Sequence, residues 1–127
     1  MRTVRRYVIQ SQLPTLNDYI QKERGNWAAA ASIKKKGTMA VQLEVMSQNR
    51  KPIEGIVDVD LYWIVPDNRQ DPDNVFFATK YILDGMVKAG VLKEDGRKNI
   101  RHISHKIKTI KGSRFVIVKF NPIKSCQ

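Results

Sequence analysis

Polar and apolar residues alternate most regularly over residues 55–65 (GIVDVDLYWIV). A period of two places the apolar side chains on one face of an extended chain, so this segment predicts a half-buried β-strand with Trp63 in the core. Residues 3–10 are rich in β-branched and aromatic types and predict another strand. Two shorter strands are predicted over roughly 100–108 and 114–120, joined by a turn at Lys111-Gly112-Ser113.

Helix-favouring stretches separate the first two of these strands. A helix is predicted over roughly 16–24, with Thr15 or Asn17 as a possible cap, and Gly25-Asn26 should interrupt it. The alanine-rich run that follows predicts a second helix from Trp27, with Trp27 itself expected in the core. The stretch TMAVQLEVMSQ after Gly37 fits either a strand or a continued helix, and the helix to about Ser47 is favoured.

The clearest helical pattern runs from Pro72 to about Ala89. Asp71 can cap this helix, Pro72 suits its first turn, and Gly90 suits its C-terminal stop. The order β–α–α–β–α–β–β then predicts an α+β fold, in which about three helices pack on a small mixed β-sheet. At 127 residues the chain should form one compact domain over 1–127.

The net charge indicates which kind of partner the protein binds. Lys and Arg number 23 against 12 Asp and Glu, a formal net charge of +11. An excess of this size in a short chain favours binding to nucleic acid over a solubilising or membrane-surface role. No apolar run approaches the roughly 20 residues of a membrane span, and no signal peptide is visible, so a cytoplasmic protein is expected. The single cysteine, Cys126, excludes an internal disulfide and is expected to be a thiol in a frayed tail.

The acidic residues are unevenly distributed. Only three acids occur in residues 1–50, whereas six of the other nine lie between Asp58 and Asp84, and Glu94 and Asp95 follow. A basic protein that gathers carboxylates in one stretch places negative charge where nucleic acid is repelled. A bound divalent cation would remove that conflict.

Spacing divides these acids into two groups. On one continuous helix, Asp73 and Asp84 would point to the same side, together with Lys80, but roughly 16 Å apart. Asp84 therefore cannot share an ion with Asp73, and near a helix C-terminus it should need a basic partner. The candidate metal ligands are Asp71 and Asp73, with Asp95 reaching them from the loop after the helix. Hard carboxylate oxygens suit Mg²⁺, for which Mn²⁺ can substitute. Taken alone, the same motifs could be only turns and caps.

The string D-P-D-N…K-x-x-L-D-G…K-A-G-V-L-K-E-D closely resembles the signature of the RusA family of crossover-junction endodeoxyribonucleases, found in bacteria and their phages. The earlier stretch L-P-T-L-N-D-Y-I-Q-K-E-R-x-N-W is similar to the opening of phage-borne members from Gram-positive hosts. The resemblance covers about two-thirds of the chain, from Leu13 to Asp95.

This resemblance implies a metal-dependent DNA endonuclease that resolves four-way (Holliday) junctions by paired nicks in recombination and repair, working as a homodimer in a bacterial or phage-infected cell. The family's paired aspartates match Asp71 and Asp73, and its later metal-binding aspartate matches Asp95. Its best-studied branch has a functional lysine four residues after the second aspartate, where this chain has Phe77. Lys80 is the candidate replacement, in contact with phosphate.

The remaining candidates support or extend this site. Asn74, Asp84 and Glu94 are expected in supporting or structural roles. Contact with DNA should come mainly from basic residues spread along the chain: Lys34, Lys35, Lys36, Arg97, Lys98, Arg101, Lys106 and Lys108, supported by Arg2, Arg5 and Arg6. His102 and His105 are three apart on a strand, so they should face opposite sides and bind no metal together; each is expected to be a surface histidine.

Three other functions stay open on the sequence alone. The chain could cut flaps or replication forks, or it could be a catalytically weak protein that binds branched DNA. The third, a basic protein-interaction factor, would need an exposed apolar face, and none is evident in the pattern.

Overall fold

The computed structural model describes residues 3–25 and 27–123 as a single α+β domain. The expectations for Arg2, for Asn26 in the break between the first two helices, and for Cys126 lie outside the described residues. The elements follow in this order: β1 (Arg5–Ile9), α1 (Leu16–Gly25), α2 (Trp27–Gln48), β2 (Val57–Val65), α3 (Pro72–Phe76), α4 (Thr79–Lys88), β3 (Ile100–Thr109) and β4 (Phe115–Pro122).

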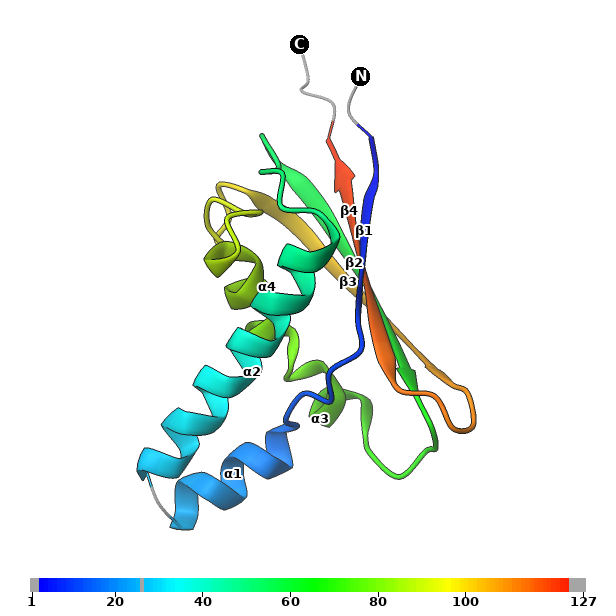
Figure 1. Cartoon of the computed structure of the whole chain (residues 1–127). Helices are drawn as coiled ribbons and strands as arrows, with labels where there is room; N and C mark the ends of the chain where they lie inside the picture. The colour runs from blue at the N-terminus through cyan, green and yellow to red at the C-terminus, as the bar shows by residue number, and fades with distance from the viewer. Residues whose placement is uncertain (1–2, 26, 124–127) are drawn as a thin grey trace.

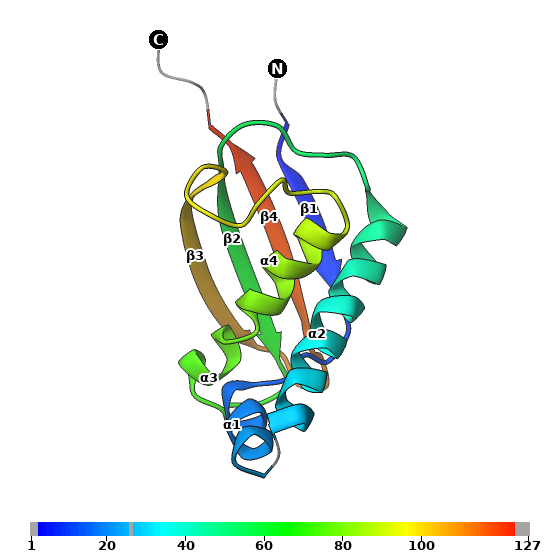
Figure 2. The ribbon, with the colours of Figure 1, turned by 90° about the vertical axis from the view of Figure 1, so that its left-hand side faces the viewer.

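The strands form one mixed sheet in the order β1-β4-β2-β3, as the predicted fold class requires. The helices lie on one face of this sheet and leave the other face open (Figures 1 and 2). β3 and β4 are joined by a short turn at Gly112, which has a positive φ of 79°, yet they do not pair with each other. β2 lies between them, parallel to β3 and antiparallel to β4.

Local sequence explains most of the element ends. The backbone N–H of Asp18 donates to the Thr15 hydroxyl at 3.3 Å, and the Thr15 N–H donates to the Asp18 carboxylate at 3.0 Å. This reciprocal pair satisfies free N–H groups at the start of α1, as a capping box does, and confirms Thr15 as the cap. Gly90 follows α4 with a φ of 81°, a conformation that glycine adopts without strain.

The expectation of one uninterrupted helix from Pro72 to Ala89 is wrong. Phe77 and Ala78 form a turn between α3 and α4, in which the Ala78 and Lys80 N–H groups bond to carbonyls three residues back. Packing of two neighbouring aromatic rings explains the break. Phe76 packs on the sheet beside Trp63, whereas the ring of Phe77 lies 5.6 Å from that of Tyr19 on α1. Asp73 and Asp84 therefore do not lie on one continuous helix, and the helix geometry that placed them on the same side does not apply.

The core lies between the sheet and the helix pair α2–α4. The apolar residues of β2 that face the helices are buried, and Trp63 is only 5% exposed, as expected from the alternation. Glycine sets the distance between the two helices, because a Cβ at Gly85 would lie 2.6 Å from the Val41 side chain. The second expectation about tryptophan is wrong: Trp27 begins α2 where that helix extends beyond the sheet, and it is 79% exposed.

The two edges of the sheet differ. At β1, the side chain of Gln48 bonds to both the N–H and the C=O of Val8, and Glu44 accepts from the N–H groups of Gln10 and Ser11. These side chains of α2 occupy backbone groups that a further strand would use. β3 forms the opposite edge. None of the described helices is long and apolar enough to cross a membrane.

Candidate functional site

Asp71 and Asp73 lie on the short segment that opens α3, and both side chains are exposed. Asp71 occupies the position before the helix without making a side-chain capping bond. α3 is fixed on two sides. The buried Asn74 accepts a 2.8 Å hydrogen bond from the Asn17 N–H on α1, and Phe76 packs on the sheet. The two aspartates therefore project from a short but firmly attached element.

Lys80 connects α4 to the loop that precedes β3. Its ammonium group lies 3.1 Å from the Asp84 carboxylate, one helical turn away, and 3.1 Å from the Asp95 carboxylate. Asp84 thus has the basic partner that its place near a helix C-terminus predicted. Hydrogen bonds to Asp95 and Asp84 raise the pKa of Lys80, and the bond from Lys80 lowers the pKa of Asp95.

A groove joins this ion-pair cluster to α2. Its lining includes Lys34 and Lys35 from α2, Asp84 from α4, and Glu94 and Asp95 from the following loop. Two of the predicted DNA-binding lysines and three of the predicted acidic residues therefore share one surface. They are up to 61 positions apart in the sequence, from Lys34 to Asp95.

The predicted metal ligands are not gathered into one centre. Among residues 3–25 and 27–123, no group of three or more histidine, cysteine, aspartate or glutamate side chains is arranged to hold a metal ion. Asp95 instead shares Lys80 with Asp84. The donor chemistry of Asp71, Asp73 and Asp95 fits a hard divalent cation, but the three carboxylates are not preassembled around one.

The predicted DNA-binding residues lie on different parts of the molecule. Lys34, Lys35 and Lys36 are exposed on α2, on the helix side of the sheet. Lys106 is in register with Tyr62 on the open face, where its ammonium group lies 5.8 Å from the centre of the Tyr62 ring. Arg97 and Lys98 are exposed in the loop between these regions. A single straight duplex cannot contact both faces of a sheet, whereas a branched substrate has several arms.

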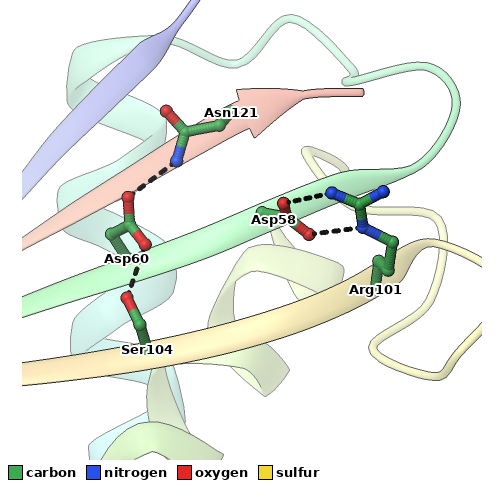
Figure 3. A network of polar contacts seen from close by, with 5 residues as sticks. All are labelled: Asp58, Asp60, Arg101, Ser104 and Asn121. Atoms are coloured by element: carbon green, nitrogen blue, oxygen red, sulfur yellow. Dashed lines mark hydrogen bonds and ion pairs between the residues drawn. The ribbon is translucent and has the colours of Figure 1, made fainter. Parts of the chain in front are cut away.

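A second carboxylate cluster, on the open face of the sheet, was not singled out from the sequence (Figure 3). Arg101 bonds to both oxygens of Asp58, at 3.2 and 2.8 Å, and lowers the pKa of that carboxyl. Asp60 accepts from Ser104 on β3 and, at 2.8 Å, from the Asn121 amide on β4. The alternation that placed both aspartates opposite the core was the available signal. Arg101, predicted to contact DNA, is therefore committed in part to the sheet.

The two histidines occupy opposite faces, as their spacing predicted. His102 is in register with Asp58 of the open face, whereas His105 accepts a 3.0 Å hydrogen bond at Nδ1 from the Trp63 indole N–H. Burial lowers the pKa of His105. The expectation that His105 is an ordinary surface residue is wrong.

No protein-family model matches the chain, and no curated protein matches it. The likeness to RusA-type nucleases accordingly rests on the motifs quoted above.

Proposed function

We propose that this protein is a divalent-cation-dependent DNA endonuclease that cuts four-way junctions, in the manner that its resemblance to the RusA family implies. The observation that carries the proposal is the groove in which Lys34 and Lys35 face Asp84, Glu94 and Asp95. Basic residues there can bind the phosphates of DNA, and Asp95 in the same groove is one of the carboxylates proposed to hold the Mg²⁺ or Mn²⁺ that phosphodiester hydrolysis requires. The net charge of +11 supports the same partner.

The proposed ligands of the cation are Asp71, Asp73 and Asp95. When bound, such a cation lowers the pKa of water and neutralises charge on phosphate. Asp95 can take part only when Lys80 releases it. A substrate phosphate is a suitable competitor for the Lys80 ammonium, which would then hold the phosphate in place of the carboxylate. Lys80 is therefore both a restraint on Asp95 and a phosphate-binding group in this proposal.

The protein would act as a homodimer in the cytoplasm of a bacterial or phage-infected cell. A four-way junction has two-fold symmetry, and one 127-residue domain carries a single D-P-D-N motif. Paired nicks are most simply made by a C2 dimer, the commonest closed assembly. Sedimentation at micromolar concentration tests this assembly, and a monomer that still makes paired nicks would exclude it.

The activity is tested on a synthetic four-way junction with Mg²⁺, with linear duplex as the control substrate. Asp73→Asn should abolish cleavage and preserve junction binding. The matched control is Asp67→Asn, which removes an equal charge from the loop before α3, where Asp67 pairs with the Arg69 side chain at 3.7 Å and accepts from the Arg69 N–H at 3.0 Å. Cleavage by wild type and by Asp67→Asn, but not by Asp73→Asn, supports the proposal. Full activity of Asp73→Asn contradicts it.

A second candidate is a branched-DNA-binding protein without cleavage activity. It is favoured by the pairing of Lys80 with both Asp84 and Asp95, which leaves no preassembled metal centre among the described residues. Tight binding of the junction by wild type, with no cleavage in Mg²⁺ or Mn²⁺, would select this candidate. Preference for flaps or forks is tested with the same panel of substrates.

A further inference from the structure

Three aromatic rings from three elements meet between α3 and the sheet. His105 on β3 stacks on Phe76 of α3, with the ring centres 4.4 Å apart and the planes 15° from parallel. Trp63 on β2 contacts both, with its ring centre 6.1 Å from that of His105 and 5.9 Å from that of Phe76. Offset contacts of this kind add stability beyond the area they bury, so the rings attach α3 to the sheet.

The hydrogen bond within this group determines the chemical form of His105. The indole nitrogen of Trp63 is a donor only, and it lies 3.0 Å from Nδ1 of His105. Nδ1 must therefore be unprotonated, so the imidazole is neutral with its proton on Nε2. A second proton, on Nδ1, would remove the hydrogen bond and set two N–H groups against each other.

The aromatic group is one attachment of α3. Another is Asn74, which is 6% exposed and accepts the hydrogen bond from the Asn17 N–H of α1. Val75 also lies in the core, with 8% of its surface exposed. Asp73 directly precedes Asn74 and lies three residues before Phe76. The direction of its exposed carboxylate therefore depends on these attachments, and the Trp63–His105 hydrogen bond within the aromatic group exists only while His105 is neutral.

We propose that His105 is a positioning residue, which in its neutral form holds Phe76, and through it α3, so that Asp71 and Asp73 keep a fixed place at the start of α3. The structural part of this inference stands by itself, whereas its consequence for cation binding and cleavage rests on the proposed function. His105 itself touches neither aspartate in this scheme and acts through Phe76.

The surroundings of His105 contain few charges that could oppose its neutral form. On β2, the residues that share its face are apolar, and Asp58 and Asp60 belong to the open face. The ionisable groups of the nearby helices are Asp73 on α3 and four residues on α4: Lys80, Tyr81, Asp84 and Lys88. Lys80 and Asp84 are paired with each other, and Tyr81 is buried. On β3 itself, Lys106 and Lys108 are exposed.

Burial lowers the pKa of His105 from its ordinary value of 6.5. The unfolded chain therefore binds this proton more readily than the folded one, and the Trp63–His105 hydrogen bond is fully formed above pH 6.5. It is lost as the pH falls from 6.5 through the lower pKa of the folded protein.

Fluorescence tests the coupling without any substrate. The chain has two tryptophans, so Trp27→Phe leaves Trp63 as the only indole. Protonated imidazole quenches an adjacent indole, and we expect a pH-dependent loss of Trp63 emission with a midpoint below 6.5. His105→Asn in the same background keeps an acceptor for the indole N–H but cannot be protonated, so this transition should vanish. A midpoint at or above 6.5, or an unchanged transition in His105→Asn, overturns the proposal.

Amide hydrogen exchange then tests whether α3 responds. The N–H groups of Val75 and Phe77 bond to the carbonyls of Asp71 and Asp73, at 3.3 and 3.2 Å. In His105→Phe, which keeps a stacking ring but offers no acceptor, their protection should fall about tenfold, the size of one net hydrogen bond. Protection should be retained in His105→Asn. Equal protection in both variants and wild type contradicts the positioning role.

Cation binding and cleavage separate this inference from the proposed function. Support or positioning of a metal ligand is typically worth about 10–100-fold in metal affinity, so Mn²⁺ should bind His105→Phe more weakly by that factor and His105→Asn nearly as wild type. Protonation of His105 should lower the cleavage rate of wild type at acid pH. This loss should be absent in His105→Asn. A normal Mn²⁺ affinity in His105→Phe overturns the proposed positioning of the aspartates. Absence of cleavage in wild type, with the fluorescence and exchange results as expected, refutes the nuclease and leaves the coupling of His105 to α3 in place.

Discussion

Two carboxylate clusters lie on opposite sides of the sheet and differ in how their oxygens are occupied. On the open face, both oxygens of Asp58 accept from Arg101, and Asp60 is held by Ser104 and Asn121 from the flanking strands (Figure 3). On the helix side, the Lys80 ammonium group is shared by Asp84 and Asp95.

This difference separates a structural cluster from one that can react. The open-face carboxylates connect β2 to both of its neighbours, and neutral donors from Ser104 and Asn121 supplement the one cation, Arg101. The helix-side cluster also has two negative charges and one positive charge, but its two carboxylates share that single cation beside a groove that contains Lys34 and Lys35. Lys80 is 58% exposed in its side chain and can exchange partners with a ligand. Whether a carboxylate cluster can react therefore depends more on the donors that hold its oxygens than on the number of carboxylates.

The largest contrast is expected in cleavage. Asp95→Asn should reduce junction cleavage by more than about 100-fold, because loss of a proposed ligand costs more than loss of its supporting partner. Asp60→Asn, which makes the same chemical change on the open face, should cleave within about threefold of wild type, since no reacting group depends on it. Single-turnover rates at saturating Mg²⁺ measure both. Similar losses of cleavage in the two variants would show that the two clusters do not differ in function.

The free energy of unfolding should depend more on the open-face cluster than on the helix-side cluster. Asp60→Ala removes two hydrogen bonds that join three strands and should lower the free energy of unfolding by about 1–2 kcal/mol. Asp84→Ala breaks only a partly exposed i,i+4 ion pair and should lower it by less than about 0.5 kcal/mol. Urea denaturation at neutral pH compares them. A greater loss in Asp84→Ala than in Asp60→Ala would show that the helix-side cluster is the structural one.

Alkaline pH should distinguish the two basic partners. The raised pKa of Lys80 means that its contribution to stability is complete below 10.5 and is lost as the pH rises through the higher pKa of the folded protein. Arg101 stays charged, so the open-face pair should persist there. The difference in urea midpoint between wild type and Lys80→Gln should therefore shrink above pH 10.5, whereas the difference between wild type and Arg101→Gln should not. If the difference in urea midpoint between wild type and Lys80→Gln stays constant through this range, the charge of Lys80 does not account for it.

Acid pH affects both clusters in the same direction. Arg101 lowers the pKa of Asp58, and Lys80 lowers the pKa of Asp95, both from an ordinary value of 3.8. Their contributions are present above 3.8 and are lost as the pH falls through the lower pKa values of the folded protein. Asp58→Asn and Asp95→Asn should each flatten the acid dependence of the urea midpoint below pH 3.8. An unchanged slope in either variant would show that its ion pair contributes nothing in solution.

The smallest effect is expected from Lys80→Gln at neutral pH. Loss of the shared cation frees Asp84 and Asp95, so binding of Mn²⁺ should strengthen by a few-fold, the modest value of exposed charges in water. The free energy of unfolding should change by less than about 0.5 kcal/mol. Calorimetric titration of Mn²⁺ into both proteins measures the first quantity. Weaker binding in Lys80→Gln would mean that Lys80 organises the carboxylates instead of restraining them.

Features that repeat at short range could be predicted from local sequence. The order of the elements, the α+β class and the buried face of β2 follow from periods of two and 3.6 residues. The cap at Thr15, the stop at Gly90 and the partner of Asp84 one turn away are equally local. Each of these depends on residues within a few positions of one another, whose geometry the backbone conformation already specifies.

Contacts between distant residues could not be predicted in this way. Phe76 packs beside Trp63 and Phe77 packs beside Tyr19, and that packing divides a helix which local propensity favours as continuous. Trp63 and His105 are 42 positions apart, and their hydrogen bond exists because β2 and β3 pair in parallel. Lys80 reaches Asp95 only because the loop after α4 folds back over the helix. Contacts of this kind depend on the packing of whole elements against each other, and no spacing within one segment encodes them.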